Sequence, residues 1–422
     1  MNQDERNRIK NLDGEELVQL QLRKLNSLLN EILPTNRFYS EKLSETRKQL
    51  SSLEELCELP YTFKDELVES GSHQDLAANL TYPVDQYVRF HRTSGTRGRP
   101  MVVLDTLDDW NWWIETWQYV LDAAEINAGD TVLLAFSFGP FIGFWSAFDA
   151  LIHRKALVVP GGGLSTLARL DLIRSTKAST VFCTPSYAIH MAEVARENHI
   201  NVAELPVKTL FVAGEPGGSI PAVRERIESA WDAQLFDHSG ASEVGPWGFA
   251  DKNNQGLHII ESEFIAEFLS LETGKEAEEG ELSELVLTTL GRYGSPVIRY
   301  RTGDIVRPSW NMDNGCQFVF LEGRVLGRTD DMMVIRGVNI FPTSIEQILR
   351  SYPEIVEYRL TAKKDGAMDR LQIEIEDRLE QPERIEKALN VRIGLKVKVD
   401  CVPIGSLPRF EGKGKRFVDE RQ

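Results

Sequence analysis

The stretch RTSGTRGRP at residues 92–100 combines three hydroxyl side chains, two glycines and three arginines. Its glycines let backbone N–H groups turn toward an anion, and its arginines keep their positive charge at neutral pH. Such a loop can hold phosphate groups. It can also be a solvated hairpin turn, because glycine-rich loops with hydroxyl side chains are common turns. The loop alone leaves both interpretations open.

Four further motifs follow this loop along the chain. They are FVAGEP (211–216), SGASEVG (239–245), YRTGD (300–304) with GRTDD (327–331) and RGVNIFP (336–342), and GKGKR (412–416). Three of them have a plain structural alternative when taken alone: a surface ion pair for Glu243, a turn for Asp330 and a charged tail for Lys413. Their order and spacing along one chain favour a shared function.

The five motifs, in this order, resemble those of the adenylate-forming enzymes, and among these the phenylacetate–CoA ligase family. The resemblance runs from about residue 35 to the C-terminus. It implies that ATP and an aromatic or similarly compact carboxylic acid form an acyl-adenylate with release of pyrophosphate, and that coenzyme A then takes the acyl group as a thioester. ATP, Mg²⁺ and coenzyme A are the implied cofactors. Transfer to an amine or a carrier protein is an alternative, and so is a nucleotide-binding protein without catalysis.

By the same resemblance, the first loop binds the β- and γ-phosphates of ATP. The implied residues are Thr93, Ser94, Gly95, Thr96, Gly98 and Arg99. Two positions depart from the family's usual loop, since Arg97 replaces a small hydroxyl residue and Arg99 replaces a lysine. Arg99 keeps the charge and adds a second donor. Arg97 either contacts phosphate or is a solvent-exposed loop residue.

Carboxylates in the later motifs match nucleotide and metal ligands of the family. Glu243 matches the glutamate that binds Mg²⁺, with Ser242 beside it, and Asp304 matches the acceptor of both ribose hydroxyls. Arg328 would reach ribose or phosphate. The other implied nucleotide contacts are Gly214, Glu215, Pro216, Asp237 and Ser239. Ser239 replaces a tyrosine that stacks on adenine in many relatives, so either another group stacks there or nucleotide binding is weaker.

Three more residues are implied in the reaction itself. Lys413 matches the lysine that reaches the carboxylate and the α-phosphate, where it offsets charge in the transition state. Asp330 matches the hinge about which the C-terminal domain swings. His238 could contact the nucleotide, the acyl carboxylate or a metal. No CxC pair accompanies it, and we expect no zinc site.

The aromatic segment AFSFGPFIGFWSAF at 135–148 resembles the wall of the family's aryl-acid pocket. The implied pocket residues are Phe136, Phe138, Phe141, Gly240 and Ala241. Aromatic walls with one polar mouth suit a flat, mostly apolar acid. The alternative is ordinary core packing, because aromatic residues at this spacing are often core residues.

The elements that must position these residues can be predicted from periodicity. Between residues 130 and 240, short β-branched runs alternate with helical segments, which predicts an α/β fold with a largely parallel sheet. TPS (184–186), GEP (214–216) and DHSGASE (237–243) then follow the carboxyl ends of strands, where ligands bind in such sheets.

Two further segments complete the expected organisation. Val18, Leu22, Leu25, Leu29 and Ile32 recur at helical spacing after a capping box at Asp13 and Glu16, which predicts a helix near the N-terminus. After residue 330 the pattern becomes compact α+β. We therefore expect a large N-terminal domain with mixed sheets flanked by helices at 1–329, and a small mobile C-terminal domain at 330–422.

Composition narrows the functional classes. The chain has 422 residues and a formal net charge of −16, which argues against binding nucleic acid or an anionic membrane through a basic face. Its four cysteines show no CxxC spacing, the N-terminus is too charged for a signal peptide, and no apolar run is long enough to span a membrane. We expect a cytoplasmic protein. Dimers are usual among relatives, so a homodimer is left open.

Overall fold

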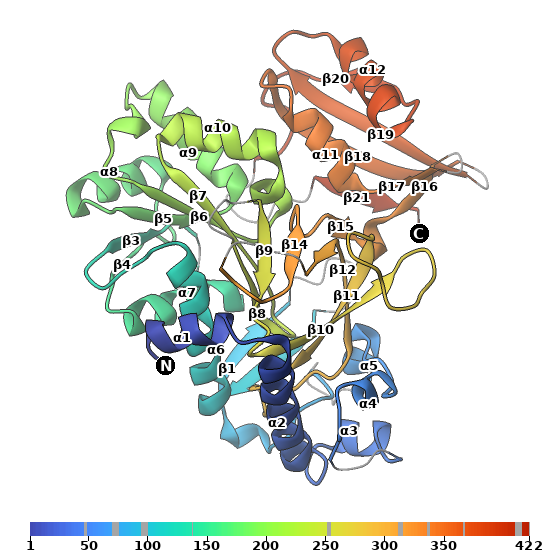
Figure 1. Cartoon of the computed structure of the whole chain (residues 1–422). Coiled ribbons are helices and arrows are strands. Elements are labelled where there is room, and N and C mark those ends of the chain that lie inside the picture. Colours follow the sequence, from blue (N-terminus) through green and yellow to red (C-terminus); the bar gives the residue numbers. More distant parts are fainter. Residues whose placement is uncertain are drawn as a thin grey trace.

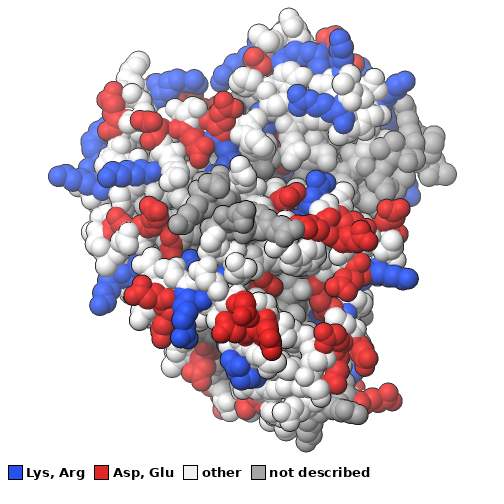
Figure 2. Space-filling view, viewed as in Figure 1, with Lys and Arg blue, Asp and Glu red and all other residues white. Residues whose placement is uncertain are grey.

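The computed structural model spans residues 1–422. The residues that it describes are 1–45, 49–69, 76–93, 100–136, 138–250, 255–310, 315–335, 338–365, 368–409 and 416–421. The fold is mixed α/β, as predicted, with several sheets in a large body and a smaller C-terminal part, drawn in orange and red in Figure 1. Acidic and basic side chains are interspersed over the face shown in Figure 2.

The largest sheet has nine strands in the order β13-β14-β9-β8-β7-β6-β5-β3-β4. Its parallel strands are β3 (Thr131–Leu134), β4 (Leu157–Pro160), β5 (Thr180–Cys183), β6 (Thr209–Val212) and β7 (Gln234–Ala241). The antiparallel strands are β8 (Gly245–Ala250), β9 (Gly256–Ile259), β13 (Pro308–Ser309) and β14 (Phe320–Glu322). The predicted alternation of strands and helices is confirmed, and the helices are α7 (Ile142–His153), α8 (Thr166–Thr176), α9 (Pro185–Glu197) and α10 (Pro221–Trp231). Short 3-10 helices are η2 (Val202–Glu204) and η3 (Pro216–Ser219).

A second sheet of the body carries two of the predicted nucleotide ligands. Its order is β10-β11-β12-β15, with β10 (Phe264–Ser270), β11 (Ser283–Thr289), β12 (Tyr300–Val306) and β15 (Gly327–Arg328). Antiparallel pairing of β12 with β15 places Asp304 directly opposite Arg328. Two motifs that are far apart in the sequence therefore meet across one ladder.

The predicted phosphate loop connects the two strands of a hairpin. The strands are β1 (Tyr87–Arg92) and β2 (Val102–Thr106), preceded by η1 (Val84–Gln86) and followed by α6 (Leu107–Ala123). Thr106 and Asp109 form a capping box that fixes the start of α6. The hairpin thereby holds both ends of the loop, whose residues 94–99 lie outside the described part of the chain.

The N-terminal helices are α1 (Gln3–Lys10), α2 (Gly14–Ile32), α3 (Arg37–Lys42), α4 (Glu54–Cys57) and α5 (Lys64–Glu69). The predicted second helix and its capping box at Asp13 are confirmed. Its buried face differs from the predicted one at Val18, which is 40% exposed. Leu17 and Gln21 are buried instead, because the Gln21 amide donates to the carbonyls of Glu261 and Phe264 and draws that face inward.

The C-terminal part has a sheet and a core of its own. Its elements are η4 (Thr329–Asp331), β16 (Met333–Ile335), β17 (Val338–Ile340), α11 (Pro342–Arg350), β18 (Ile355–Asp365), β19 (Met368–Asp377), α12 (Pro382–Ile393), β20 (Val399–Cys401) and β21 (Phe417–Glu420). One apolar cluster runs from Met333 to Val399. The boundary at 329/330 stays a prediction. Among the described residues, no helix is long and apolar enough to cross a membrane.

Candidate active site

The carboxyl ends of β5 and β6 bring two of the predicted motifs together. Ser186, at the start of α9, donates its backbone N–H to the Glu215 carboxylate at 2.9 Å, and its hydroxyl donates to the same oxygen. The other carboxylate oxygen of Glu215 accepts from Arg416 at 3.2 Å. All the contacts found for this carboxylate in the described structure are therefore to protein groups that fix its orientation.

Glu243, the predicted Mg²⁺ ligand, is paired with a residue that the sequence motifs did not suggest. Lys64, which opens α5, places its Nζ 2.6 Å from Glu243 Oε1. Burial alone would raise the pKa of the Glu243 carboxyl, but the charge and hydrogen bond of Lys64, with Arg328 contributing, lower this pKa below its usual value. The carboxylate is therefore ionised at neutral pH, as a metal or cation ligand must be.

A fully buried arginine stabilises the turn formed by Ser242 and Glu243. Arg292 donates to the carbonyls of Ser242 and Glu243 at 2.9 and 3.0 Å, and its Nε donates to Asp105 Oδ1 at 2.8 Å. Both Arg292 and Asp105 are completely shielded from solvent. Because Asp105 lies in β2, Arg292 connects the hairpin of the phosphate loop to the turn that carries Glu243. Sequence reasoning missed Arg292, which lies in the connection between β11 and β12 outside the motifs.

Asp304 and Arg328 form the second cluster of predicted ligands. Arg328 donates to Asp304 Oδ1 at 2.8 Å and to the carbonyl of Thr302 at 3.1 Å. The hinge candidate Asp330 lies 3.7 Å from the same guanidinium. Gly303 has a φ of +75°, and a Cβ there would come within 3.0 Å of Arg328. The strand thus needs a glycine beside Asp304, which explains the G in YRTGD.

His238 is a neutral imidazole in this structure. Surrounding groups desolvate the ring, with Trp117 at a centroid distance of 4.4 Å, and this burial lowers the pKa of His238 to about 4. Its Nδ1 lies 2.8 Å from the carbonyl of Gly248, so Nδ1 carries the proton. The lone pair on Nε2 then suits a hydrogen-bond donor, such as a hydroxyl, better than it suits an acyl carboxylate.

Asp237, a predicted nucleotide contact, is buried and lies close to the backbone at Gly218. Its carboxylate lies 3.4 Å from Arg324 Nε and accepts from the backbone N–H of His238 at 2.8 Å. A Cβ on Gly218 would come within 2.8 Å of this carboxyl group. Asp237 therefore supports the loop after β6, whereas Ser239, two residues on, is half-buried.

The residues of the predicted aromatic wall differ in burial. Phe136 is buried and stacks on Phe144 at 4.3 Å, and Phe138 meets Trp145 edge-on at 4.9 Å. Phe141 is 43% exposed. Gly240 approaches His238 so closely that a Cβ would lie 3.2 Å from its Nε2, and Ala241 is half-buried in β7. The pocket assignment of these five positions stays a prediction.

Several predicted site residues lie outside the described part of the chain. They are Ser94, Gly95, Thr96, Gly98, Arg99 and Lys413. Thr93 is described and buried, and its hydroxyl accepts from the backbone N–H of Met101 at 3.0 Å. This hydrogen bond thus links the two ends of the loop. Gly214 has a φ of +93°, which favours glycine at the turn before Glu215.

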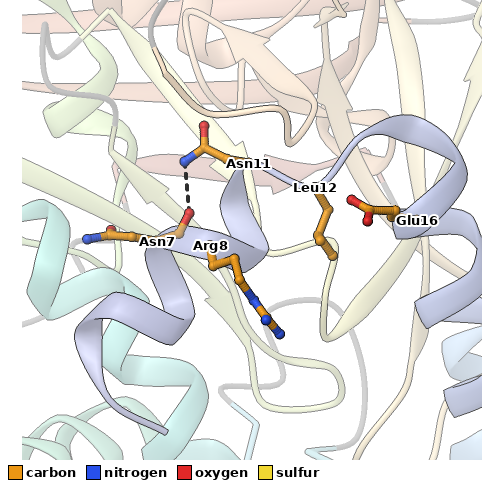
Figure 3. Close-up of a pocket in the computed structure, with 5 residues that line it drawn as sticks. All are labelled: Asn7, Arg8, Asn11, Leu12 and Glu16. Atoms are coloured by element: carbon orange, nitrogen blue, oxygen red, sulfur yellow. Dashed lines mark hydrogen bonds between the residues drawn. The ribbon is translucent and has the colours of Figure 1, made fainter.

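A surface pocket lies apart from these clusters (Figure 3). It is lined by Asn7, Arg8, Asn11, Leu12 and Glu16, from α1, α2 and the turn between them. Asn11 donates to the carbonyl of Asn7 at 2.8 Å, which stabilises the end of α1. None of the motif residues lines this pocket, so we do not place the active site there.

Comparison with known proteins identifies the family. Residues 337–421 match the family model described as the AMP-binding enzyme C-terminal domain. A phenylacetate-coenzyme A ligase of Aromatoleum evansii is 32% identical over 389 residues, which cover 88% of this chain and 86% of the relative. The chain belongs to the phenylacetate–CoA ligase family. A phenylacetate–CoA ligase of Thermus thermophilus is 29% identical over 98% of this chain, so the likeness includes the N-terminal helices that the motifs left out. The predicted reaction class is thereby confirmed: the chain is an AMP-forming acid–CoA ligase.

Two solved structures of one CoA ligase, in different states, differ in their similarity to this chain. A 2-hydroxyisobutyryl-CoA ligase in the postadenylation state, in complex with R3-HIB-AMP, is 26% identical with a TM-score of 0.91. The same ligase with 2-HIB-AMP and CoA in its thioesterification state gives a TM-score of only 0.74. Both comparisons cover 98% of this chain and 92% of the solved one. The chain is therefore more similar to the postadenylation structure of that ligase than to its thioesterification structure.

Proposed function

We propose that this ligase activates an aromatic or similarly compact carboxylic acid, and that the Glu243 and Asp304 clusters bind the nucleotide. The observation that carries the proposal is the pair of carboxylates, Glu243 and Asp304, each in a short ion pair with a basic side chain, at the motifs where the family binds nucleotide. In the first step a carboxylate oxygen of the acid attacks the α-phosphorus of ATP, and pyrophosphate leaves. In the second step the thiol of coenzyme A attacks the acyl carbon, and AMP leaves.

Glu243 fits a magnesium ion bound with ATP. Mg²⁺ is usually held by one or two carboxylates together with substrate phosphates and water, so a single ionised glutamate is sufficient. Bound Mg²⁺ would neutralise charge on the phosphates. The role of Lys64 is to keep Glu243 ionised and oriented, and the role of Arg292 is to fix the turn on which Glu243 lies. Asp304 would accept from the ribose hydroxyls while the hydrogen bond from Arg328 orients its carboxylate.

Two classes of acid have support from specific observations. The stacked rings of Phe136 and Phe144 and the ring of Phe138 provide flat apolar surface, which suits an aryl acid. A compact hydroxy acid is the second candidate, because the 2-hydroxyisobutyryl-CoA ligase has a TM-score of 0.91 and the bare Nε2 of His238 can accept from a hydroxyl. We favour the aryl acid because the aromatic cluster is larger than a hydroxy acid needs.

A screen of acids tests the proposed substrate class. Pyrophosphate release from ATP should be measured with phenylacetate, benzoate, 2-hydroxyisobutyrate and acetate, each with and without CoA. We expect the largest kcat/KM with an aryl acid, and acyl-CoA as the product. Preference for 2-hydroxyisobutyrate would favour the second class. Acyl-adenylate that accumulates with CoA present, but is consumed when an amine or a carrier protein is added, would contradict CoA as the acceptor.

A further inference from the structure

Arg416 joins the C-terminal part to the large body through two carboxylates. Its Nε and one terminal nitrogen donate to both oxygens of Glu357, in β18 of the same part, at 2.7 and 3.0 Å. Its other terminal nitrogen donates to Glu215 of the body at 3.2 Å. All three side chains are less than 10% exposed. Arg416 also follows the predicted catalytic Lys413 by three residues in the sequence.

The two contacts of Arg416 differ in strength and in what happens if the parts separate. The bidentate pair with Glu357 lies within one part and would move with it. The single bond to Glu215 crosses between the parts. After separation Arg416 would keep Glu357, and Glu215 would keep its two hydrogen bonds from Ser186. Neither charge would be left buried and alone, which is what makes loss of a buried ion pair costly.

A neighbouring contact between the two parts brings arginines from both sides near each other. Helix α11 packs against α10 of the body, where Arg226 lies. Burial, together with the nearby charges of Arg350 and Arg378 from the C-terminal part, lowers the pKa of Arg226 against the opposing effect of Glu193. Arg226 and Arg350 each have a carboxylate of their own part beside them, Glu193 at 3.0 Å and Glu346 at 3.7 Å. The bond between Arg416 and Glu215, by contrast, is an attraction between opposite charges of the two parts.

We propose that Arg416 is a positioning residue for the first half-reaction, and that its bond to Glu215 holds the C-terminal part in the arrangement that forms the acyl-adenylate. The bond must break before CoA reacts. The inference rests on the two-step function proposed above. It agrees with the TM-score of 0.91 to a postadenylation structure against 0.74 to a thioesterification structure.

Two glutamine variants with opposite expected effects test this role. Glu215→Gln keeps an acceptor for Ser186 but loses the charge that attracts Arg416. It should slow acid-dependent ATP–pyrophosphate exchange about fivefold to tenfold, and slow the conversion of added acyl-adenylate and CoA to thioester by a smaller factor. Glu357→Gln removes the bidentate carboxylate that Arg416 contacts within the C-terminal part. It should spare the exchange and slow thioester formation instead.

A measurement independent of turnover reads the arrangement directly. Cys57 of α4 and Cys401 of β20 are the exposed cysteines of the body and of the C-terminal part, whereas Cys183 and Cys316 are buried. A donor–acceptor dye pair on the two exposed thiols should report one main transfer efficiency in the wild type and a second, populated state in Glu215→Gln. Identical transfer in the two proteins would overturn the inference.

The kinetic outcomes are equally decisive. If Glu215→Gln lowers both half-reactions alike and weakens binding of acyl-adenylate, then Glu215 acts on the nucleotide and the positioning role is wrong. If the wild type catalyses neither half-reaction, the proposed function fails, but the dye measurement still decides whether Arg416 holds the two parts together.

Discussion

Replacing Lys413 by alanine should lower adenylate formation by about 10²–10³-fold, the loss that follows removal of one charge-stabilising donor from an active site. The reason is that negative charge grows between the carboxylate and the α-phosphate as pyrophosphate leaves, and a cation there stabilises the transition state more than the ground state. ATP binding should change little. The measurement is acid-dependent ATP–pyrophosphate exchange, together with ATP affinity by calorimetry.

Lys415 provides the matched control for this substitution. It has the same side chain two residues further on, so Lys415→Ala makes an equal change of charge in the same tail. We expect it to keep most of the exchange activity. Unchanged exchange in Lys413→Ala, or equal losses in both variants, would remove Lys413 from the mechanism and leave the charged-tail interpretation.

Replacing Arg292 by methionine should destabilise the protein by about 3–5 kcal/mol, because it leaves a buried carboxylate without its partner. In a site with no solvent access, Asp105 would lose its arginine and retain His91 3.6 Å away, and the carbonyls of Ser242 and Glu243 would lose the hydrogen bonds from Arg292. The thermal unfolding midpoint should therefore fall markedly, and the KM for ATP should rise in any folded fraction as the Glu243 turn loosens.

An exposed ion pair offers the control for Arg292→Met. Arg37 pairs with Glu41 along α3 at 2.9 Å, but these side chains are 90% and 68% exposed. Arg37→Met should leave the unfolding midpoint close to that of the wild type, as expected for a surface site. If the two variants unfold at the same temperature, the buried Arg292 does not stabilise the turn that carries Glu243.

Sequence periodicity and motif order predicted the parallel strands, the helix after Asp13 and the family, because these features depend on residues close together along the chain. The pairs that orient the site could not be predicted in this way. Lys64 meets Glu243, Arg292 meets Asp105, and Arg416 meets Glu215, across separations of 179, 187 and 201 residues. Each pair depends on which elements the sheets bring together, and no local pattern specifies that.

The environment of individual side chains also could not be predicted from the sequence. The sequence offered His238 three different partners, whereas burial beside Trp117 favours the neutral ring and the hydrogen bond to the carbonyl of Gly248 leaves the lone pair on Nε2. Similarly, spacing alone grouped Phe136 with Phe141. In the structure both rings contact Phe144, but Phe136 is in the core whereas Phe141, at the start of α7, is 43% exposed.

Isotope transfer tests the central claim most directly, namely that the acid is activated by attack on the α-phosphorus of ATP. The wild-type protein should be incubated with ATP, CoA and an acid that carries ¹⁸O in both carboxylate oxygens, and the products analysed by mass spectrometry. One labelled oxygen should bridge to phosphorus and leave with AMP, while the other stays in the thioester. AMP without label, or label in inorganic phosphate formed with ADP, would contradict the account.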